Sequence, residues 1–154
     1  MCGIVGYVGP RKARPILLAG LEKLEYRGYD SAGISVLDGD RIDAVRAVGN
    51  LSALRDAIEA NGGHDRGAGA VALAEAPQPG TGIGHTRWAT HGRVTEENAH
   101  PHFDNTDRVH IVVNGIVENY IALKRRLVAE GADFTSETDA ICARLREVVE
   151  TALA

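Results

Sequence analysis

The chain has 154 residues, of which 44% are hydrophobic and 25% charged, as is ordinary for a soluble globular domain with a real core. Its net charge is −4 and its basic and acidic residues are interspersed, so the sequence shows no cluster of basic residues of the kind that binds nucleic acid or an anionic membrane. No apolar run is long enough to cross a bilayer, two cysteines make no disulfide framework, and no signal peptide precedes Cys2. We therefore expect one cytoplasmic domain.

The amino terminus carries the most informative pattern, because Cys2 follows Met1 and precedes a glycine and a short apolar run. If Met1 is removed, Cys2 becomes the first residue and holds a nucleophile and a base together. Its α-amino group, with a pKa of about 7.7 to 8.0, can accept the thiol proton. Residues 4–8 are expected to form a buried strand that fixes the thiol. The alternative is a small hydrophobic cysteine near the start of a strand.

Hydrophobic spacing and turn residues predict the elements of the first half. In chain order they are a helix over residues 11–24, a polar loop over 25–33, a hairpin of strands 34–37 and 42–48 around Asp38-Gly39-Asp40, and a short helix over 51–60.

The second half is predicted in the same way. Its elements are a flexible surface excursion over residues 62–82, a strand over 83–87, a polar loop through residue 102, a buried strand over 108–113, a helix over 119–130 and a final helix opened by the capping box Ser136-Glu137-Thr138-Asp139. Because there is no regular βαβ alternation, we expect the α+β class with a largely antiparallel sheet.

Thiol-dependent amide hydrolysis also needs oxyanion donors and a clamp for the substrate, and candidates for both follow predicted strands. Asn114 and Gly115 could supply an amide and a backbone N–H to one oxyanion, although an Asn-Gly pair more often forms the turn of a β-hairpin. Arg87 could hold a carboxylate in a bidentate fork, although a solvated surface arginine is commoner. Asp139 could pair with an ammonium, with helix capping as its alternative.

Three further features are weaker. Trp88, the only tryptophan, could cover a pocket or simply pack in its loop. His85, His91, His100 and His102 fall close together, but their spacing fits no standard zinc pattern, so we expect satisfied structural histidines and no metal. No phosphate-binding glycine loop is present, and no cofactor is expected.

Taken together, the motifs resemble the glutaminase domain of the glutamine–fructose-6-phosphate aminotransferases, or glucosamine-6-phosphate synthases, among the class II glutamine amidotransferases. The resemblance runs from Cys2 to about Asp139 and rests on six blocks in order. These are Cys2-Gly3-Ile4-Val5-Gly6, Glu25-Tyr26-Arg27-Gly28-Tyr29-Asp30-Ser31-Ala32-Gly33, Gly84-His85-Thr86-Arg87-Trp88-Ala89-Thr90-His91-Gly92, Asn98-Ala99-His100-Pro101-His102, Asn114-Gly115-Ile116-Val117-Glu118-Asn119 and Ser136-Glu137-Thr138-Asp139.

The resemblance implies an N-terminal nucleophile hydrolase fold, a four-layer αββα sandwich, and hydrolysis of L-glutamine to glutamate and ammonia. It makes Cys2 the catalytic nucleophile and Asn114 with Gly115 the oxyanion hole. The implied glutamine-binding residues are Arg87 for the α-carboxylate, Asp139 for the α-ammonium, Thr90 and His91 in the pocket wall, Trp88 in the closing loop and Arg27 near the active site.

The resemblance further implies that the ammonia passes to a sugar-phosphate isomerase domain or chain that uses fructose 6-phosphate. On this basis residues 1–154 are a partial type-2 glutamine amidotransferase domain, truncated at its carboxyl-terminal part, and such a sheet would expose an edge and an apolar face. A truncated glutamine-binding or scaffold remnant, and a domain serving another acceptor, stay open. The oligomeric state stays open as well, with a homodimer as one alternative.

The chain departs from the family pattern at several points. Val113 stands where the family usually has histidine, and Ala140-Ile141 stands where it typically has Thr-Glu. Residues 62–82 look longer than usual. These departures put the packing near Cys2 and the correspondence beyond Asp139 in question.

Overall fold

The computed structural model describes residues 1–61, 80–90 and 92–138. Its elements in chain order are β1 (Gly3–Gly9), α1 (Ala13–Glu22), the 3-10 turn η1 (Glu25–Arg27), β2 (Ser31–Asp38), β3 (Arg41–Val48), α2 (Leu51–Ala60), β4 (Gly80–Arg87), β5 (His102–Phe103), β6 (His110–Ile111) and α3 (Tyr120–Ala129). Strands thus alternate with helices irregularly, as predicted.

The central sheet has the strand order β1-β4-β2-β3, and every neighbouring pair is antiparallel. The hairpin of β2 and β3 turns at Gly39, whose φ of 60° suits the first central position of a two-residue turn. The chain then reaches β4, which inserts between β1 and β2 and joins the first strand to the hairpin. The described sheet therefore matches the predicted antiparallel α+β class.

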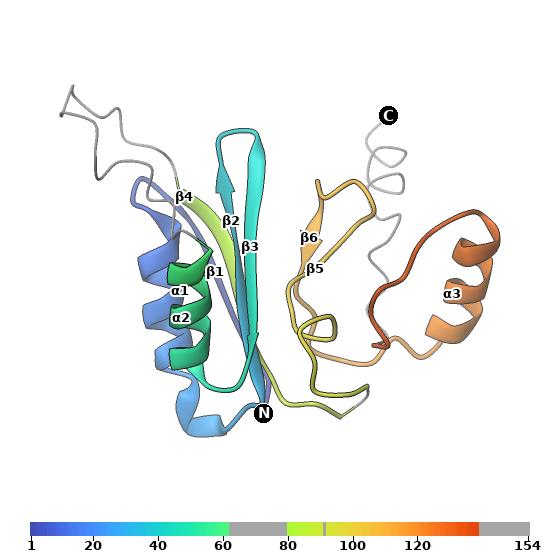
Figure 1. Cartoon of the computed structure of the whole chain (residues 1–154), viewed down its shortest axis with the longest axis horizontal. Coiled ribbons are helices and arrows are strands. Elements are labelled where there is room, and N and C mark those ends of the chain that lie inside the picture. Colours follow the sequence, from blue (N-terminus) through green and yellow to red (C-terminus); the bar gives the residue numbers. More distant parts are fainter. Residues whose placement is uncertain (62–79, 91, 139–154) are drawn as a thin grey trace.

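Helices α1 and α2 cover one face of this sheet (Figure 1). Each buries a stripe of apolar side chains at helical spacing, and Asn50 caps α2 by accepting the N–H of Ala53. The stripes are Ala13, Leu17 and Leu21 in α1, and Leu51, Leu54 and Ile58 in α2. No helix within the described ranges is long and apolar enough to span a membrane.

The approach of α1 to the sheet depends on two glycines of β4. A Cβ added at Gly82 would lie 2.8 Å from Leu17, and one added at Gly84 would lie 3.2 Å from Leu21. Because neither position carries a side chain, the leucines rest on the β4 backbone itself. This close packing holds β4 in the middle of the sheet.

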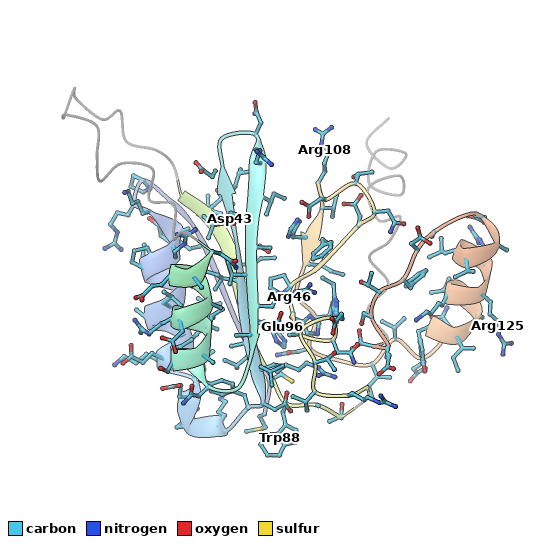
Figure 2. All side chains as sticks on the ribbon, viewed as in Figure 1. Asp43, Arg46, Trp88, Glu96, Arg108 and Arg125 are labelled. Carbon is cyan, nitrogen blue, oxygen red and sulfur yellow. The ribbon has the colours of Figure 1, made fainter. Side chains whose placement is uncertain are left out.

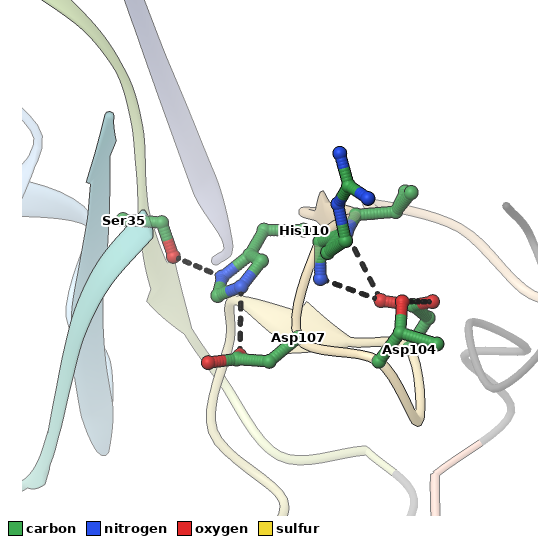
Figure 3. Close-up of polar contacts among 7 residues, drawn as sticks. Ser35, Asp104, Asp107 and His110 are labelled. Carbon is green, nitrogen blue, oxygen red and sulfur yellow. Dashed lines mark hydrogen bonds and ion pairs between the residues drawn. The ribbon is translucent and has the colours of Figure 1, made fainter. Parts of the chain in front are cut away.

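The other face of the sheet is covered by the β5–β6 ribbon, with α3 outermost, so that the layers follow the order α, β, β, α (Figure 1). A polar chain ties the two β layers together (Figure 3). The Oγ of Ser35 in β2 lies 2.8 Å from His110 Nδ1, and His110 Nε2 lies 3.0 Å from Asp107 Oδ1. The second β layer is small, since each of its strands has two residues.

Several predicted boundaries were wrong. The strand expected over residues 108–113 is only β6 and contains no fully buried residue, because the Asp104 carboxylate accepts the N–H groups of Arg108 and Val109 and turns the chain there. β5 lies inside the expected polar loop. β2 begins at Ser31, which pairs with Arg87, and β4 begins at Gly80 within the expected excursion.

The remaining helices follow the prediction where they are described. The predicted helix over residues 119–130 is α3, which ends before Gly131 with its φ of 89°. α3 has no fully buried residue, and Ile121 and Val128 are about half exposed. Residues 62–79, and all but the start of the helix expected after the capping box Ser136-Glu137-Thr138-Asp139, lie outside the described residues.

Gly33 sets the spacing between the two β layers, because a Cβ added there would collide with the backbone oxygen of His100 and lie 2.9 Å from that of Val45. We expect Gly33→Ala to lower the free energy of unfolding by about 1–3 kcal/mol or more. Gly6→Ala is the matched control, since a Cβ at Gly6 meets nothing within 4 Å. Urea unfolding measures both variants, and equal effects would contradict this layer contact.

Candidate active site

The pairing of β1 with β4 places Cys2 at one end of the sheet. Gly3 pairs with Thr86, so in the same register Cys2, the residue before β1, lies opposite Arg87, the last residue of β4. The backbone N–H of Trp88 points to Cys2 Sγ at 3.3 Å, and Sγ lies 3.7 Å from the Trp88 carbonyl oxygen. The thiol is therefore held by the backbone at the exit of β4.

The loop before β2 reaches the same end of the sheet through Asp30. Its backbone N–H donates to the Arg87 carbonyl at 2.8 Å, and its carboxylate accepts the Ala89 N–H at 2.5 Å and the Ser31 hydroxyl at 3.1 Å. The Trp88 ring passes close to Gly28, where an added Cβ would be 3.3 Å away. Figure 2 shows Trp88 at this end of the molecule, where Figure 1 places the amino terminus.

The amino-terminal ammonium occupies a defined position beside the thiol. Met1 N donates to the carbonyl oxygens of Arg27 at 3.1 Å and Gly28 at 2.9 Å. Two backbone carbonyls thus bind an ammonium next to Cys2. In the chain that retains Met1, the α-amino group belongs to Met1 and not to the cysteine.

A pocket of about 360 Å³ opens beside Cys2. Its walls bring together six of the nine predicted site residues with five others, namely Met1, Cys2, Arg87, Trp88, Thr90, His100, Val113, Asn114, Gly115, Ile116 and Thr138. Arg27 lines an adjoining cavity of about 440 Å³ that also touches Cys2. His91 and Asp139 lie outside the described residues.

Arg87 and Trp88 occupy different depths of this pocket. Arg87 is 4% exposed and donates from Nη1 to the Arg93 carbonyl at 3.2 Å, so it is not a solvated surface arginine. Trp88 is 52% exposed and lies at the rim. A buried guanidinium beneath an exposed aromatic side chain suits a small anionic ligand.

Asn114 and Gly115 follow β6, and the next described element is α3, so the Asn-Gly pair is not a hairpin turn. Gly115 has a φ of 147°, which favours glycine. Asn114 Oδ1 lies 2.7 Å from His85 Nε2. Both residues line the pocket next to Cys2.

His85, His100 and His102 form a cluster between the two β layers, in which His85 stacks on His100 and His102 meets His100 edge to face. The His85 and His100 rings are 4.2 Å apart, and the His100 and His102 rings are 4.4 Å apart. Burial lowers the pKa of His100 to about 2, with the neighbouring imidazoles adding to the shift, and burial also lowers the pKa of His85. These two rings are therefore uncharged at neutral pH.

The expectation of satisfied structural histidines needs correction. The Nδ1 atoms of His85 and His100 have no hydrogen-bond partner, and His100 lines the pocket. Sequence reasoning missed this role, although the Asn98-Ala99-His100-Pro101-His102 block contained the signal. Across the described ranges, no group of three or more metal-binding side chains could hold an ion.

Asn98 holds Ser136 and Glu137, the residues just before the pocket-lining Thr138, a role that sequence reasoning also missed. Its side chain is 1% exposed, donates to the Arg93 carbonyl at 3.0 Å and accepts the Glu137 N–H at 2.8 Å. Hydrogen bonds from the Arg93 N–H and from Asn98 hold the pKa of Glu137 below its ordinary value. This network fixes Thr138 in the pocket wall.

Comparison with known proteins identifies the family. Residues 46–150, well over half of the chain, match the family described as a glutamine amidotransferase domain. The chain belongs to this glutamine amidotransferase family. The match includes Arg87, Asn114 and Gly115 of the pocket and begins after Cys2.

Curated relatives carry the name glutamine–fructose-6-phosphate aminotransferase [isomerizing]. Those from Caldanaerobacter subterraneus and Synechocystis are 49% and 50% identical over 139 residues, and that from Tropheryma whipplei is 52% identical over 141 residues. Each alignment covers 90% of this chain but only 20% or 21% of the relative. The chain thus spans about a fifth of the length of these relatives.

A solved structure gives the fold. The glutamine phosphoribosylpyrophosphate amidotransferase from B. subtilis, complexed with ADP and GMP, matches with a TM-score of 0.60 and 25% identity. The match covers 99% of this chain and 32% of that chain. It confirms the predicted N-terminal nucleophile hydrolase fold class, in which the described layers follow the order α, β, β, α.

The neutral His100 predicts a pH dependence of stability. Its pKa of about 2 in the folded chain lies below the ordinary value of 6.5, so between these values the unfolded chain binds a proton that the folded chain does not. Stability should therefore fall as the pH drops below about 6.5, by up to about 1.4 kcal/mol per pH unit for this histidine. Urea unfolding between about pH 5 and pH 8 measures this slope.

His100→Gln should reduce the slope, because glutamine does not titrate. Some slope should remain, since the pKa of His85 is lowered in the same direction. An unchanged slope in this variant would contradict the assignment to His100.

Proposed function

We propose that the chain hydrolyses L-glutamine to glutamate and ammonia, with Cys2 as the nucleophile after removal of Met1. One observation carries the proposal: a thiol, an Asn-Gly pair and a buried arginine line one pocket. A thiol alone is a weak signal, but together these groups supply what amide transfer through a thioester requires. The family match and the names of the relatives favour the same reaction.

In the proposed reaction, the α-amino group of Cys2 takes the thiol proton and the thiolate attacks the amide carbon of glutamine. The carbonyl oxygen becomes an oxyanion, which Asn114 Nδ2–H and the Gly115 N–H stabilise. Collapse of the intermediate breaks the C–N bond, and the α-ammonium returns the proton to the leaving ammonia. Water then attacks the γ-glutamyl thioester, which releases glutamate and restores the thiol.

The pocket also suggests how glutamine is held. Arg87 would bind the α-carboxylate at the base of the pocket, and Thr90 would line its wall. Asp139, the residue after Thr138 in the sequence, would pair with the α-ammonium, and His91 would line the pocket with Thr90. Trp88 would cover the bound amino acid from the rim, and Arg27 would border the site from the adjoining cavity.

We further propose that the ammonia serves amide transfer to fructose 6-phosphate, in a sugar-phosphate isomerase domain or partner chain. The support is the shared name of relatives about 50% identical to this chain. The glutaminase step needs no cofactor, since the thiol and its own amine supply the chemistry. We infer a cytoplasmic location, because reducing surroundings keep such a thiol free, and a homodimer is the assembly to test first.

A different acceptor is the second candidate, because the solved structure with the same fold is named for phosphoribosylpyrophosphate. That structure is 25% identical to this chain, whereas the aminotransferase relatives are about twice as similar. We therefore favour fructose 6-phosphate. Both acceptors require the same glutaminase half-reaction.

Release of glutamate from L-glutamine tests the half-reaction directly. We expect the chain that begins at Cys2 to be active, and Cys2→Ala to lose essentially all activity, because Cys2 is the one thiol among the described residues that line the pocket. The chain that retains Met1 should also be inactive, since its α-amino group is on the wrong residue. Mass spectrometry assigns the terminus of each sample.

Equal glutamate release from the processed chain and from Cys2→Ala would reject the enzymatic proposal. Tight glutamine binding without hydrolysis in the processed chain would instead favour a non-catalytic binding domain. Isothermal titration calorimetry with L-glutamine distinguishes these two outcomes.

A further inference from the structure

His85 contacts the candidate oxyanion hole from behind. Its ring is 1% exposed and lies between the two β layers, and its Nε2 is 2.7 Å from Asn114 Oδ1. Asn114 itself is exposed and lines the pocket with Cys2. One end of the Asn114 amide is thus bound to a buried ring, and the other end is left for the pocket.

The chemistry of the ring decides which end that is. Burial lowers the pKa of His85, so the ring is neutral and carries a single N–H. Its Nδ1 has no hydrogen-bond partner, and an N–H there would be buried and unsatisfied. A bare Nδ1 lone pair is the less costly arrangement, which places the proton on Nε2.

The backbone supports the same placement. The pKa of His85 is raised, against the larger effect of burial, by hydrogen bonds with Asn114 and with the backbone of Val113. Both effects favour the charged ring, as expected where an N–H of His85 donates to an oxygen atom. The Asn114 atom that lies 2.7 Å from His85 Nε2 is Oδ1, which can accept such an N–H.

We propose that His85 is a positioning residue, which donates from Nε2–H to Asn114 Oδ1 and so turns the Asn114 Nδ2–H group toward the pocket and Cys2. Without this donor the amide can rotate and present its oxygen, which would repel a developing oxyanion. His85 would thereby set the polarity of the oxyanion hole without touching substrate. The proposal rests on the glutaminase function given above.

The position of His85 in the fold explains why such control is available. It lies in β4 two residues before Arg87, at the strand whose end also fixes the Cys2 thiol. Its ring stacks on His100 at 4.2 Å, which limits its rotation. A rigid central strand therefore orients the thiol and, through His85, the amide that would stabilise the oxyanion.

The first test reads the tautomer and does not depend on activity. A two-bond 1H–15N correlation spectrum of the labelled chain should show His85 as the Nε2–H tautomer. In His85→Leu, the side-chain NH₂ resonances of Asn114 should shift or broaden as the amide loses its fixed partner. An Nδ1–H tautomer would overturn the proposal.

The second test uses kinetics in the chain that begins at Cys2. His85→Leu should lower kcat for glutamate release by about 10²–10³, as for loss of an oxyanion donor, with a much smaller change in KM. His85→Gln, whose amide can still donate, should recover most of this loss. Alkylation of Cys2 by iodoacetamide should stay at the wild-type rate, because attack at a saturated carbon forms no oxyanion.

His110→Leu is the matched control, since it removes a buried, hydrogen-bonded imidazole that lies outside the pocket walls. It should change stability but not kcat per folded molecule. A wild-type kcat in His85→Leu, or a parallel loss of alkylation without recovery in His85→Gln, would overturn the positioning role. A wild-type chain that releases no glutamate would refute the proposed function, and the tautomer would still decide the role of His85.

Discussion

The antiparallel pairing of β1 with β4 is the constraint on which the rest of the molecule depends. It places the start of the chain beside the end of β4, so the Cys2 thiol meets the Trp88 backbone and Cys2 falls opposite Arg87 in the register. The pairing of β2 with β4 brings Asp30 and the Arg27 carbonyl to the same edge. Three segments distant in sequence therefore meet at one end of one sheet.

The sequence was informative where chemistry and local spacing agreed. The stripes of α1 and α2 and the Gly39 turn follow from periodicity and turn preferences, which short-range contacts satisfy. The motif blocks grouped Cys2, Arg87 and Asn114 although each had a commoner local role, and the structure places all three around one pocket. Turn, capping and surface preferences favoured the commoner roles, because these preferences take no account of which strand ends become neighbours in the fold.

The errors have a physical pattern as well. The apolar run over residues 108–113 reads as a buried strand, but the Asp104 carboxylate captures two backbone N–H groups that a longer ladder would have used. The extra residues of β2 and β4 are small or polar and carry little strand signal, yet they pair because their partners are already aligned. The pairing between strands thus decided where each strand begins and ends, and the hydrophobic periodicity of the sequence carries no information about that pairing.

The cluster of His85, His100 and His102 shows what a polar layer between the two sheets can do. Three imidazoles and Ser35 occupy positions where apolar side chains would have made a simpler core. A buried ring that stays neutral has a fixed donor and a fixed acceptor, so it can orient a neighbouring amide in a way that a methyl group cannot. Burial keeps the His85 ring uncharged, which lowers the stability of the folded chain in acid. The same uncharged state leaves one N–H on the ring, which it can donate to Asn114. The polar layer therefore links the packing of the sheets to the chemistry proposed at their edge.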